Sequence, residues 1–282
     1  MKTIDEIIRS HFPVLTKKQK RIAEFITANL EETAFLSLSR LAQKIKVSEA
    51  SISRFCFKLG FDSYKDLQNN LRELIKLKIS PLIKAKKSFS NGKKNNFENV
   101  IKADIDNLEN LMQNISWGKI DDAVKLILDA NKVYVIGLRS SFAPAYLLYH
   151  YLNHIGIRSE LLDPHAGRLI DQIIYVDKND VIIGISFPRY FKETIEVLKY
   201  VRTQKCRTII ITDNILSASA INGEVILTAK WHTPIPFVSY VSILSLIHCL
   251  IFGIITRRKR GAITTIEKIE NMMKIWNCRI ME

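Results

Sequence analysis

Residues Leu36–Phe61 read "LSLSRLAQKIKVSEASISRFCFKLGF" and contain two short helical patterns with only a few residues between them. Ser37 or Ser39 can cap the first helix, and Ser48 can cap the second. The apolar side chains recur at helical spacing, which predicts one buried face: Leu41, Ala42, Ile45, Ile52, Phe55 and Leu59. Because the connection spans only residues 45–47, the two helices are expected to pack as a helix-turn-helix.

One position departs from the usual form of this motif. The turn needs a residue with positive φ, most often glycine, because glycine has no Cβ. Lys46 stands there in this sequence, at a modest steric cost. From Ile4 to about Leu77 the spacing is helical without an alternating strand pattern, and Thr16 can cap another helix. We therefore expect an all-α helix-turn-helix domain over residues 1–77.

The positive charge of the chain lies mostly in this first part. The 282 residues carry a formal net charge of +14. Residues 1–94 hold 20 Lys and Arg against 9 Asp and Glu, a balance of +11, whereas residues 95–282 hold 22 against 19, a balance of +3. Such an asymmetry indicates a polyanionic partner, nucleic acid or a membrane surface, although an ordinary basic surface is the plainer alternative.

In a helix-turn-helix the second helix enters the major groove of duplex DNA with its N-terminus first. The side chains expected on its outward face are Ser48, Glu49, Ser51, Ser53, Arg54 and Lys58. Arg54 can bind guanine through two hydrogen bonds, and serine hydroxyls can contact phosphates or base edges. Other cations are expected to contact phosphates: Arg40, Lys44, Lys17 and Lys18. Any single lysine fits a solvated surface as well, so the prediction of DNA binding depends on motif and charge together.

A connecting segment is predicted over residues 78–97, marked by Pro81, Gly92 and a cluster of Lys and Asn. From residue 98 onward, apolar runs alternate with amphipathic ones. The runs interpreted as strands are "KVYVIG" (132–137), "IRSELLD" (157–163), "DVIIGIS" (180–186), "RTIIIT" (207–212) and "EVILTA" (224–229). This alternation predicts an α/β domain over residues 98–282, with a mainly parallel five-stranded sheet flanked by helices.

Polar residues follow three of these strands, at the edge where parallel sheets bind ligands. "GLRSS" (137–141) follows the first strand, "SFPRY" (186–190) the third and "TDN" (212–214) the fourth. Hydroxyls, free amides at helix starts and two arginines favour an anionic small molecule. The predicted contacts are Arg139, Ser140, Ser141, Ser186, Arg189, Thr212 and Asp213. For Ser141 alone, a helix cap is an equally good interpretation.

The sequence predicts no metal and no cofactor. His150 and His154 lie four residues apart on one predicted helix, but no third ligand accompanies them. The four cysteines are far apart and form no Cys-x-x-Cys pair, which favours a reducing, cytoplasmic environment. Residues 238–255 form an 18-residue apolar run followed by "RRKR", yet three Ser, one His and one Tyr interrupt it. We expect a buried or subunit-contact helix there rather than a membrane span.

The two parts together resemble the RpiR family of bacterial transcription regulators, in which a helix-turn-helix domain precedes a sugar isomerase (SIS) domain. The most specific part is "LAQKIKVSEASISRFCFKLGFDSYKDLQNNL" (41–71), and the resemblance covers nearly the whole chain. It implies a flavodoxin-like SIS fold, a double-stranded DNA operator, a carbohydrate-derived effector such as a phosphosugar, and a homodimer or homotetramer. By position, Ser140, Ser141 and Ser186 match the family's ligand contacts, whereas Arg189 is our own physical inference.

Two positions depart from the SIS pattern. A Ser-x-Ser-Gly-x-Thr loop is common after the third strand, but residues 186–190 lack that glycine, and the usual Ser-Pro after the fourth strand is Ser217-Ala218. The competing hypothesis is a sugar-phosphate isomerase with a basic N-terminal appendage, which needs a general base near the reacting carbon. Glu193 and His165 are the candidates, and neither lies in a catalytic motif. We therefore assign no catalytic residue and expect the chain not to be an enzyme.

Overall fold

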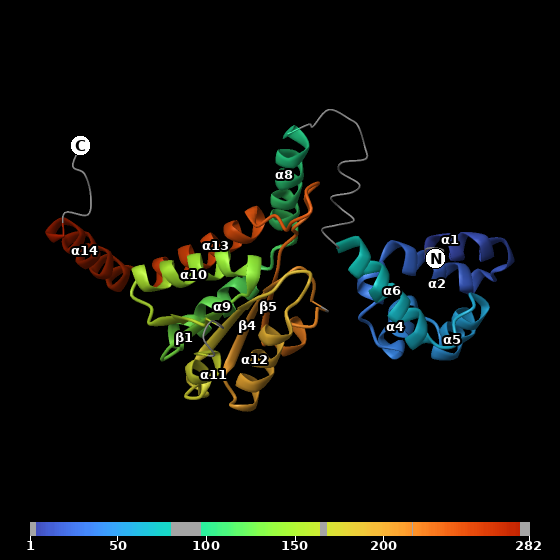
Figure 1. The fold of residues 1–282 in the computed structure, drawn as a ribbon, viewed down its shortest axis with the longest axis horizontal. Helices are drawn as coiled ribbons and strands as arrows, with labels where there is room; N and C mark the ends of the chain where they lie inside the picture. Colours follow the sequence, from blue (N-terminus) through green and yellow to red (C-terminus); the bar gives the residue numbers. More distant parts are fainter. Residues whose placement is uncertain (1–3, 80–96, 164–167, 216, 277–282) are drawn as a thin grey trace. The chain divides into compact units, whose positions relative to one another are not determined.

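The structure is a computed structural model and describes residues 4–79, 97–163, 168–215 and 217–276. The chain divides into two compact units, Met1–Asn91 and Gly92–Glu282. The first unit is helical in its described part, and the second combines a sheet with helices (Figure 1). Helix α6 (Tyr64–Ile79) and helix α8 (Phe97–Asn114) overlap the ends of the predicted 78–97 connection, whose remaining residues lie outside the described ones.

The described part of the first unit consists of short helices. They are α1 (Ile4–His11), the 3₁₀ turn η1 (Phe12–Val14), α2 (Lys17–Ala28), α3 (Leu30–Thr33), α4 (Leu38–Ile45), α5 (Glu49–Lys58) and α6. Thr16 caps α2, because its hydroxyl accepts from the Gln19 N–H at 3.4 Å while the Gln19 side chain accepts from the Thr16 N–H at 3.0 Å. Ser37 caps α4 by accepting from the Arg40 N–H at 3.3 Å. The predicted all-α architecture is confirmed for these residues.

Helices α4 and α5 form the predicted helix-turn-helix. Lys46 lies between them with φ 57° and ψ 53°, the left-handed conformation that the turn requires. The Val47 N–H donates to the Ala42 carbonyl at 3.0 Å, which closes the end of α4. Ile52 and Phe55 of α5 are fully buried. Burying each such side chain contributes roughly 1.5–3 kcal/mol, so this inward face fixes which side chains of α5 remain outside.

The second unit is built on a five-stranded sheet of order β2-β1-β3-β4-β5, parallel throughout. The strands are β1 (Val133–Ile136), β2 (Ser159–Leu161), β3 (Val181–Ile185), β4 (Arg207–Thr212) and β5 (Val225–Thr228). Besides α8, the helices are α9 (Trp117–Asp129), α10 (Phe142–His154), α11 (Arg168–Ile173), α12 (Lys192–Thr203), α13 (Val241–Arg257) and α14 (Lys259–Ile275). Strands β1 and β3 are buried along their whole length, as their unbroken Val and Ile runs predict. The five predicted strands and their parallel pairing are confirmed.

Helices cover both faces of this sheet. Figure 1 shows α9, α10 and α13 on one face and α11 and α12 on the other, where one apolar cluster includes Tyr134, Ile182, Leu198 and Ile210. The chain proceeds from β1 toward one edge of the sheet and from β3 toward the other, so these two adjacent strands mark a topological switch point. Ligands of such sheets bind in the crevice beyond the carboxyl ends of the strands at that point.

Helix α13 occupies most of the apolar run of residues 238–255. Its residues Ile243, Leu246, Ile247 and Leu250 are buried in the fold, as expected for a core helix. Within the part of the chain that the structure describes, no single helix is long and apolar enough to cross a membrane. Helices α13 and α14 meet that test only as a pair, by length and composition, and are bent by 106° at their junction.

Candidate functional site

The loop after β1 brings two serine hydroxyls to the switch point. Gly137 directly follows the strand, and a Cβ on it would lie 2.3 Å from the Ser141 carbonyl oxygen. Only glycine therefore lets the 3₁₀ turn η2 (Arg139–Ser141) fold back so closely. Arg139 has φ 56°, a conformation that costs a non-glycine residue roughly 1–2 kcal/mol. Ser140 is exposed beside this turn, while Ser141 is buried at the start of α10.

Tyr240, at the beginning of α13, completes this group and was missed by the sequence analysis. Its hydroxyl donates to Ser140 Oγ at 3.0 Å and lies 3.2 Å from Ser141 Oγ. The edge of its ring faces the ring of Phe187, with the centroids 6.0 Å apart. The sequence gives only a weak signal for this residue. Tyr240 is an aromatic residue with a hydroxyl that stands just before an apolar helix, and it belongs to no recognised motif.

The loop after β3 lies against the loop after β1. Ser186 is buried, and the Arg139 guanidinium lies 5.8 Å from the centroid of the Phe191 ring. Counted from Ser186, the glycine of the Ser-x-Ser-Gly-x-Thr pattern falls on Arg189, which has φ 80° and is exposed. The loop thus keeps the backbone conformation that glycine favours but carries a guanidinium there. The structure brings together Arg139, Ser140 and Ser141 with the segment that contains Ser186 and Arg189.

The residues after β4 are arranged differently from the prediction. Thr212 is fully buried, and its hydroxyl donates to Asp213 Oδ1 at 3.1 Å and lies 3.1 Å from Ser217 Oγ. Asp213 also accepts from the Tyr190 hydroxyl at 2.7 Å. Thr212 therefore does not expose its hydroxyl at this edge in the structure, and its contact with a ligand stays a prediction. Asp213 instead lines a separate cavity of about 320 Å³ at the same edge, with Asn110 and Asn114 of α8 and with Lys230.

Helix α5 presents most of its predicted residues to solvent. Ser48, Glu49, Arg54 and Lys58 are exposed and Ser53 is partly so. Ser51 is the exception, since it is only 8% exposed and its hydroxyl lies 2.8 Å from Ser48 Oγ. Placing Ser51 on the outward face was therefore wrong: it precedes Ile52 and lies one helical turn before Phe55, on the packed side of α5.

Two apolar residues lie on the outward face of α5 and were not anticipated. Ala50 is exposed, and Phe57 is 62% exposed. Together with Ser53 and Arg54 they follow the three- and four-residue spacing of one helix face. The same spacing is present in the sequence, where Ala50 and Phe57 share the face of Ser53 and Arg54.

The cations around α5 differ in how freely they can meet a phosphate. Arg40, Lys17 and Lys18 are exposed. Lys44 forms an ion pair with Glu32, and Lys58 donates a hydrogen bond to the carbonyl of Val14. Each of these lysines would have to give up its partner within the protein before it could bind a phosphate.

The histidine and glutamate candidates lie outside the serine group. The rings of His150 and His154 lie 4.2 Å apart, and the described residues contain no group of three His, Cys, Asp or Glu placed to hold a metal. Glu193 is exposed in the first turn of α12. His165 lies outside the described residues.

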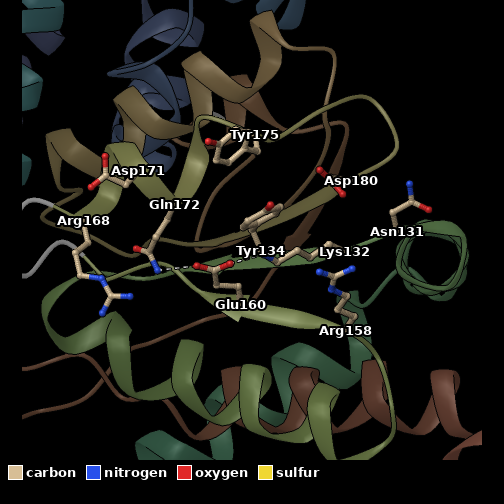
Figure 2. Close-up of a pocket in the computed structure, with 10 residues that line it drawn as sticks. All are labelled: Asn131, Lys132, Tyr134, Arg158, Glu160, Arg168, Asp171, Gln172, Tyr175 and Asp180. Carbon is tan, nitrogen blue, oxygen red and sulfur yellow. Dashed lines mark hydrogen bonds and ion pairs between the residues drawn. The ribbon is translucent and has the colours of Figure 1, made fainter.

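A cavity of about 520 Å³ lies beside the amino-terminal ends of β1 and β2, opposite to the serine loops. Figure 2 shows Lys132, Glu160 and Gln172 within it, with Glu160 between the other two. Lys132 forms an ion pair with Glu160, and the Gln172 amide donates to the same carboxylate at 3.0 Å. Burial alone would raise the pKa of Glu160, but the bonds from Lys132 and Gln172 outweigh it and lower that pKa below its ordinary value.

Glu160→Gln is expected to lower the free energy of unfolding by about 1 kcal/mol at pH 7, because it removes the charge from a half-buried pair. A carboxyl whose pKa is lowered on folding stabilises the folded state above its ordinary pKa, and that contribution disappears as the pH falls through the folded-state value. In urea titrations the difference between wild type and variant should therefore shrink as the pH falls below the ordinary pKa of glutamate and through the lowered folded-state value. Glu196→Gln, in the more exposed pair with Lys199, is the matched control; a difference independent of pH would contradict the assignment.

Comparison with known proteins fits this arrangement. A family model described as a helix-turn-helix domain of the rpiR family matches residues 2–77, and the SIS domain model matches residues 126–252. The chain belongs to the RpiR family. It is a helix-turn-helix transcriptional regulator that carries a SIS domain, as the resemblance implied.

Similar proteins cover most of this RpiR-family chain. HexR, an HTH-type transcriptional regulator of Pseudomonas aeruginosa, is 24% identical over 262 residues, which span 92% of this chain and 91% of HexR. The solved structure of Vibrio vulnificus NanR complexed with ManNAc-6P has a TM-score of 0.63 at 17% identity, over 95% of this chain and 97% of NanR. The sugar isomerase domain of an RpiR transcription factor from Sphaerobacter thermophilus has a TM-score of 0.59 at 27% identity, over 61% of this chain and 96% of that domain.

Proposed function

We propose that this RpiR-family regulator reads an operator through α5, and that a phosphorylated sugar or amino sugar binds as its effector at the carboxyl edge of the SIS sheet. The observation that carries the effector assignment is the group formed by Ser140, Ser141 and Tyr240 at the switch point. The exposed Arg139 lies in the same loop, and the exposed Arg189 lies in the loop after β3. Hydroxyls suit the sugar, and guanidinium groups suit a phosphate. The ManNAc-6P bound to NanR supports this ligand class.

The proposed reading surface combines polar and apolar chemistry. Arg54 is placed to pair with guanine, and Ala50 and Phe57 offer apolar contacts of the kind that recognise thymine methyl groups. Arg40, Lys17 and Lys18 add phosphate contacts, which supply affinity without sequence choice. The operator is then read by α5, and the surrounding cations set the salt dependence.

The effector assignment is tested by thermal shift of the purified full-length protein against a panel of phosphorylated hexoses and amino sugars that includes ManNAc-6P. We expect at least one member to raise Tm in a concentration-dependent manner, since a ligand that binds only the folded state stabilises it. The unphosphorylated form of the same sugar should give a smaller shift, because it lacks the group that the arginines bind. Equal shifts for both forms would contradict the phosphate assignment.

We further propose that the chain forms a homodimer or a homotetramer through the α10, α13 and α14 side of the SIS domain. Exposed apolar side chains gather on these helices, among them Tyr146 (50%), Phe252 (69%), Ile266 (39%) and Met272 (49%). Phe252→Glu should reduce the mass measured by light scattering after size exclusion. Ile170→Glu, on α11 at the other face and 71% exposed, should leave it unchanged. A wild-type protein that is already monomeric would refute self-association.

A catalytic role has less support than regulation. Glu193 is exposed, and sugar isomerisation needs a base held close to the reacting carbon. We therefore propose that the SIS domain binds its ligand without turning it over and that the protein acts in the cytoplasm, where it meets its operator. Conversion of a panel sugar phosphate by the purified protein would favour the isomerase instead.

A further inference from the structure

Tyr240 connects the serine loop after β1 with the segment that joins β5 to α13. Its hydroxyl bonds with Ser140 and Ser141 in the loop after β1, as described above. It is also the last of residues 229–240, which join β5 to α13 and are called the β5–α13 segment below. A ligand in the serine loop and the position of this segment therefore depend on the same side chain.

The β5–α13 segment is fastened to α8. Asn107, only 3% exposed, donates from Nδ2 to the His232 carbonyl at 2.7 Å and accepts from the His232 N–H at 3.1 Å. Ser239, next to Tyr240, donates to the Asp104 carboxylate. A buried amide that satisfies both backbone groups of one residue is costly to leave unpaired. The segment and α8 are thus expected to move together or lose these bonds.

Helix α8 is well placed to pass on such a movement. Figure 1 shows it beside the beginning of α13, and it is the first described helix that follows the DNA-binding unit along the chain. With Asn110 and Asn114 it also lines the cavity next to Asp213 at the carboxyl edge of the sheet. The β5–α13 segment is therefore the only intermediate needed to connect a conformational change at the serine loop with α8, the first described helix of the second unit.

We propose that Tyr240 is a positioning residue that transmits occupancy of the Ser140–Ser141 site to α8 through the β5–α13 segment. The proposal rests on the proposed function, because it assigns the route by which an effector reaches the DNA-binding unit. The single hydroxyl proton of Tyr240 is donated to Ser140, so in the contact with Ser141 the serine donates to Tyr240. A phosphate oxygen that accepts the Ser141 hydroxyl proton therefore takes that bond from Tyr240. Freeing Tyr240 shifts the equilibrium of the segment, and Asn107 and Asp104 carry that shift to α8.

The test is hydrogen exchange by mass spectrometry on the full-length, ligand-free protein. Tyr240→Phe keeps the ring and removes only the hydroxyl. We expect it to accelerate exchange roughly threefold to tenfold in peptides covering both residues 229–240 and residues 100–110, since losing one hydrogen bond shifts local opening by about that factor. Tyr175→Phe removes a hydroxyl from an 84% exposed tyrosine and should change neither region.

A second variant probes the other end of the route. Ser239→Ala cuts the bond to Asp104 and should accelerate exchange in residues 100–110 while the loop at residues 137–141 keeps its wild-type rate. Faster exchange confined to residues 137–141 in Tyr240→Phe would overturn the proposal. So would an α8 response in Tyr175→Phe equal to that in Tyr240→Phe.

The same preparations separate this inference from the proposed function. If wild type binds no DNA in a salt titration, the proposed function fails whatever the exchange data show. If wild type binds DNA but Tyr240→Phe leaves α8 at the wild-type exchange rate, the regulator stands and the proposed route through Tyr240 is wrong.

Discussion

Replacing Ser140 and Ser141 together by alanine is expected to abolish the thermal stabilisation that the effector gives this regulator. Both hydroxyls lie at the switch point beside the exposed Arg139, where the carboxyl ends of β1 and β3 meet. A ligand present at 100 times its Kd stabilises the folded state by about 2.7 kcal/mol, and a variant that no longer binds loses all of it. The measurement is the Tm shift of wild type and variant at the same concentration of the phosphosugar from the panel.

The comparison uses the shift and not Tm itself. Ser140 accepts a hydrogen bond from Tyr240, so the double variant is expected to be less stable without ligand by about 1 kcal/mol. Ser116→Ala is the matched control, because this exposed serine precedes α9 without forming a side-chain capping bond. A shift that survives in the double variant would place the effector elsewhere, and the cavity around Glu160 in Figure 2 would be the next site to examine.

Arg54→Ala is expected to weaken binding to the operator by roughly 1–3 kcal/mol, a factor of about 5 to 150, while leaving the fold intact. Arg54 is exposed on α5 and its Nε donates to the Ala50 carbonyl of its own helix at 3.2 Å. Its side chain therefore has little to do with packing. Fluorescence anisotropy at one fixed salt concentration measures the effect.

Arg54→Lys is the control that separates charge from geometry. Lysine keeps the positive charge but cannot form the two-pronged contact of a guanidinium, so most of the loss should remain. If Arg54→Ala loses the same amount of affinity for the operator and for unrelated DNA duplexes, Arg54 contacts phosphate rather than a base. Unchanged affinity in Arg54→Ala would remove α5 as the reading helix.

Local patterns were enough to predict the two folds. The helix-turn-helix follows from apolar spacing over about twenty residues and from the Ser37 cap, and Lys46 adopts the left-handed conformation that its place in the turn requires. Ser48 stands before α5 as predicted but forms no side-chain capping bond, because its hydroxyl pairs with Ser51. The sheet follows from unbroken Val and Ile runs such as those of β1 and β3. In both cases the residues that determine a helix or a strand lie within that element or directly beside it.

The candidate site depends on contacts between distant residues, and there the sequence was less informative. Tyr240 bonds to serines about a hundred positions away, and Asn107 bonds to His232 over 125 positions, in no recognisable motif. Thr212 is the opposite case: its hydroxyl at a strand end predicts a ligand contact, yet in the structure this hydroxyl bonds with Asp213 and lies 3.1 Å from Ser217 Oγ inside the fold. Polarity at a strand end points to an edge of the sheet without telling which side chains face outward.

Whether this protein is an effector-controlled DNA-binding regulator is decided by a salt-dependent titration of the full-length protein against chromosomal DNA fragments, with and without the phosphosugar from the panel. We expect tight binding to at least one fragment, a log–log salt slope of about −0.9 for each phosphate neutralised, and a change in Kd when the sugar is added. Binding to every fragment with one Kd that the sugar does not alter, or no salt-sensitive binding to any fragment, would contradict that function.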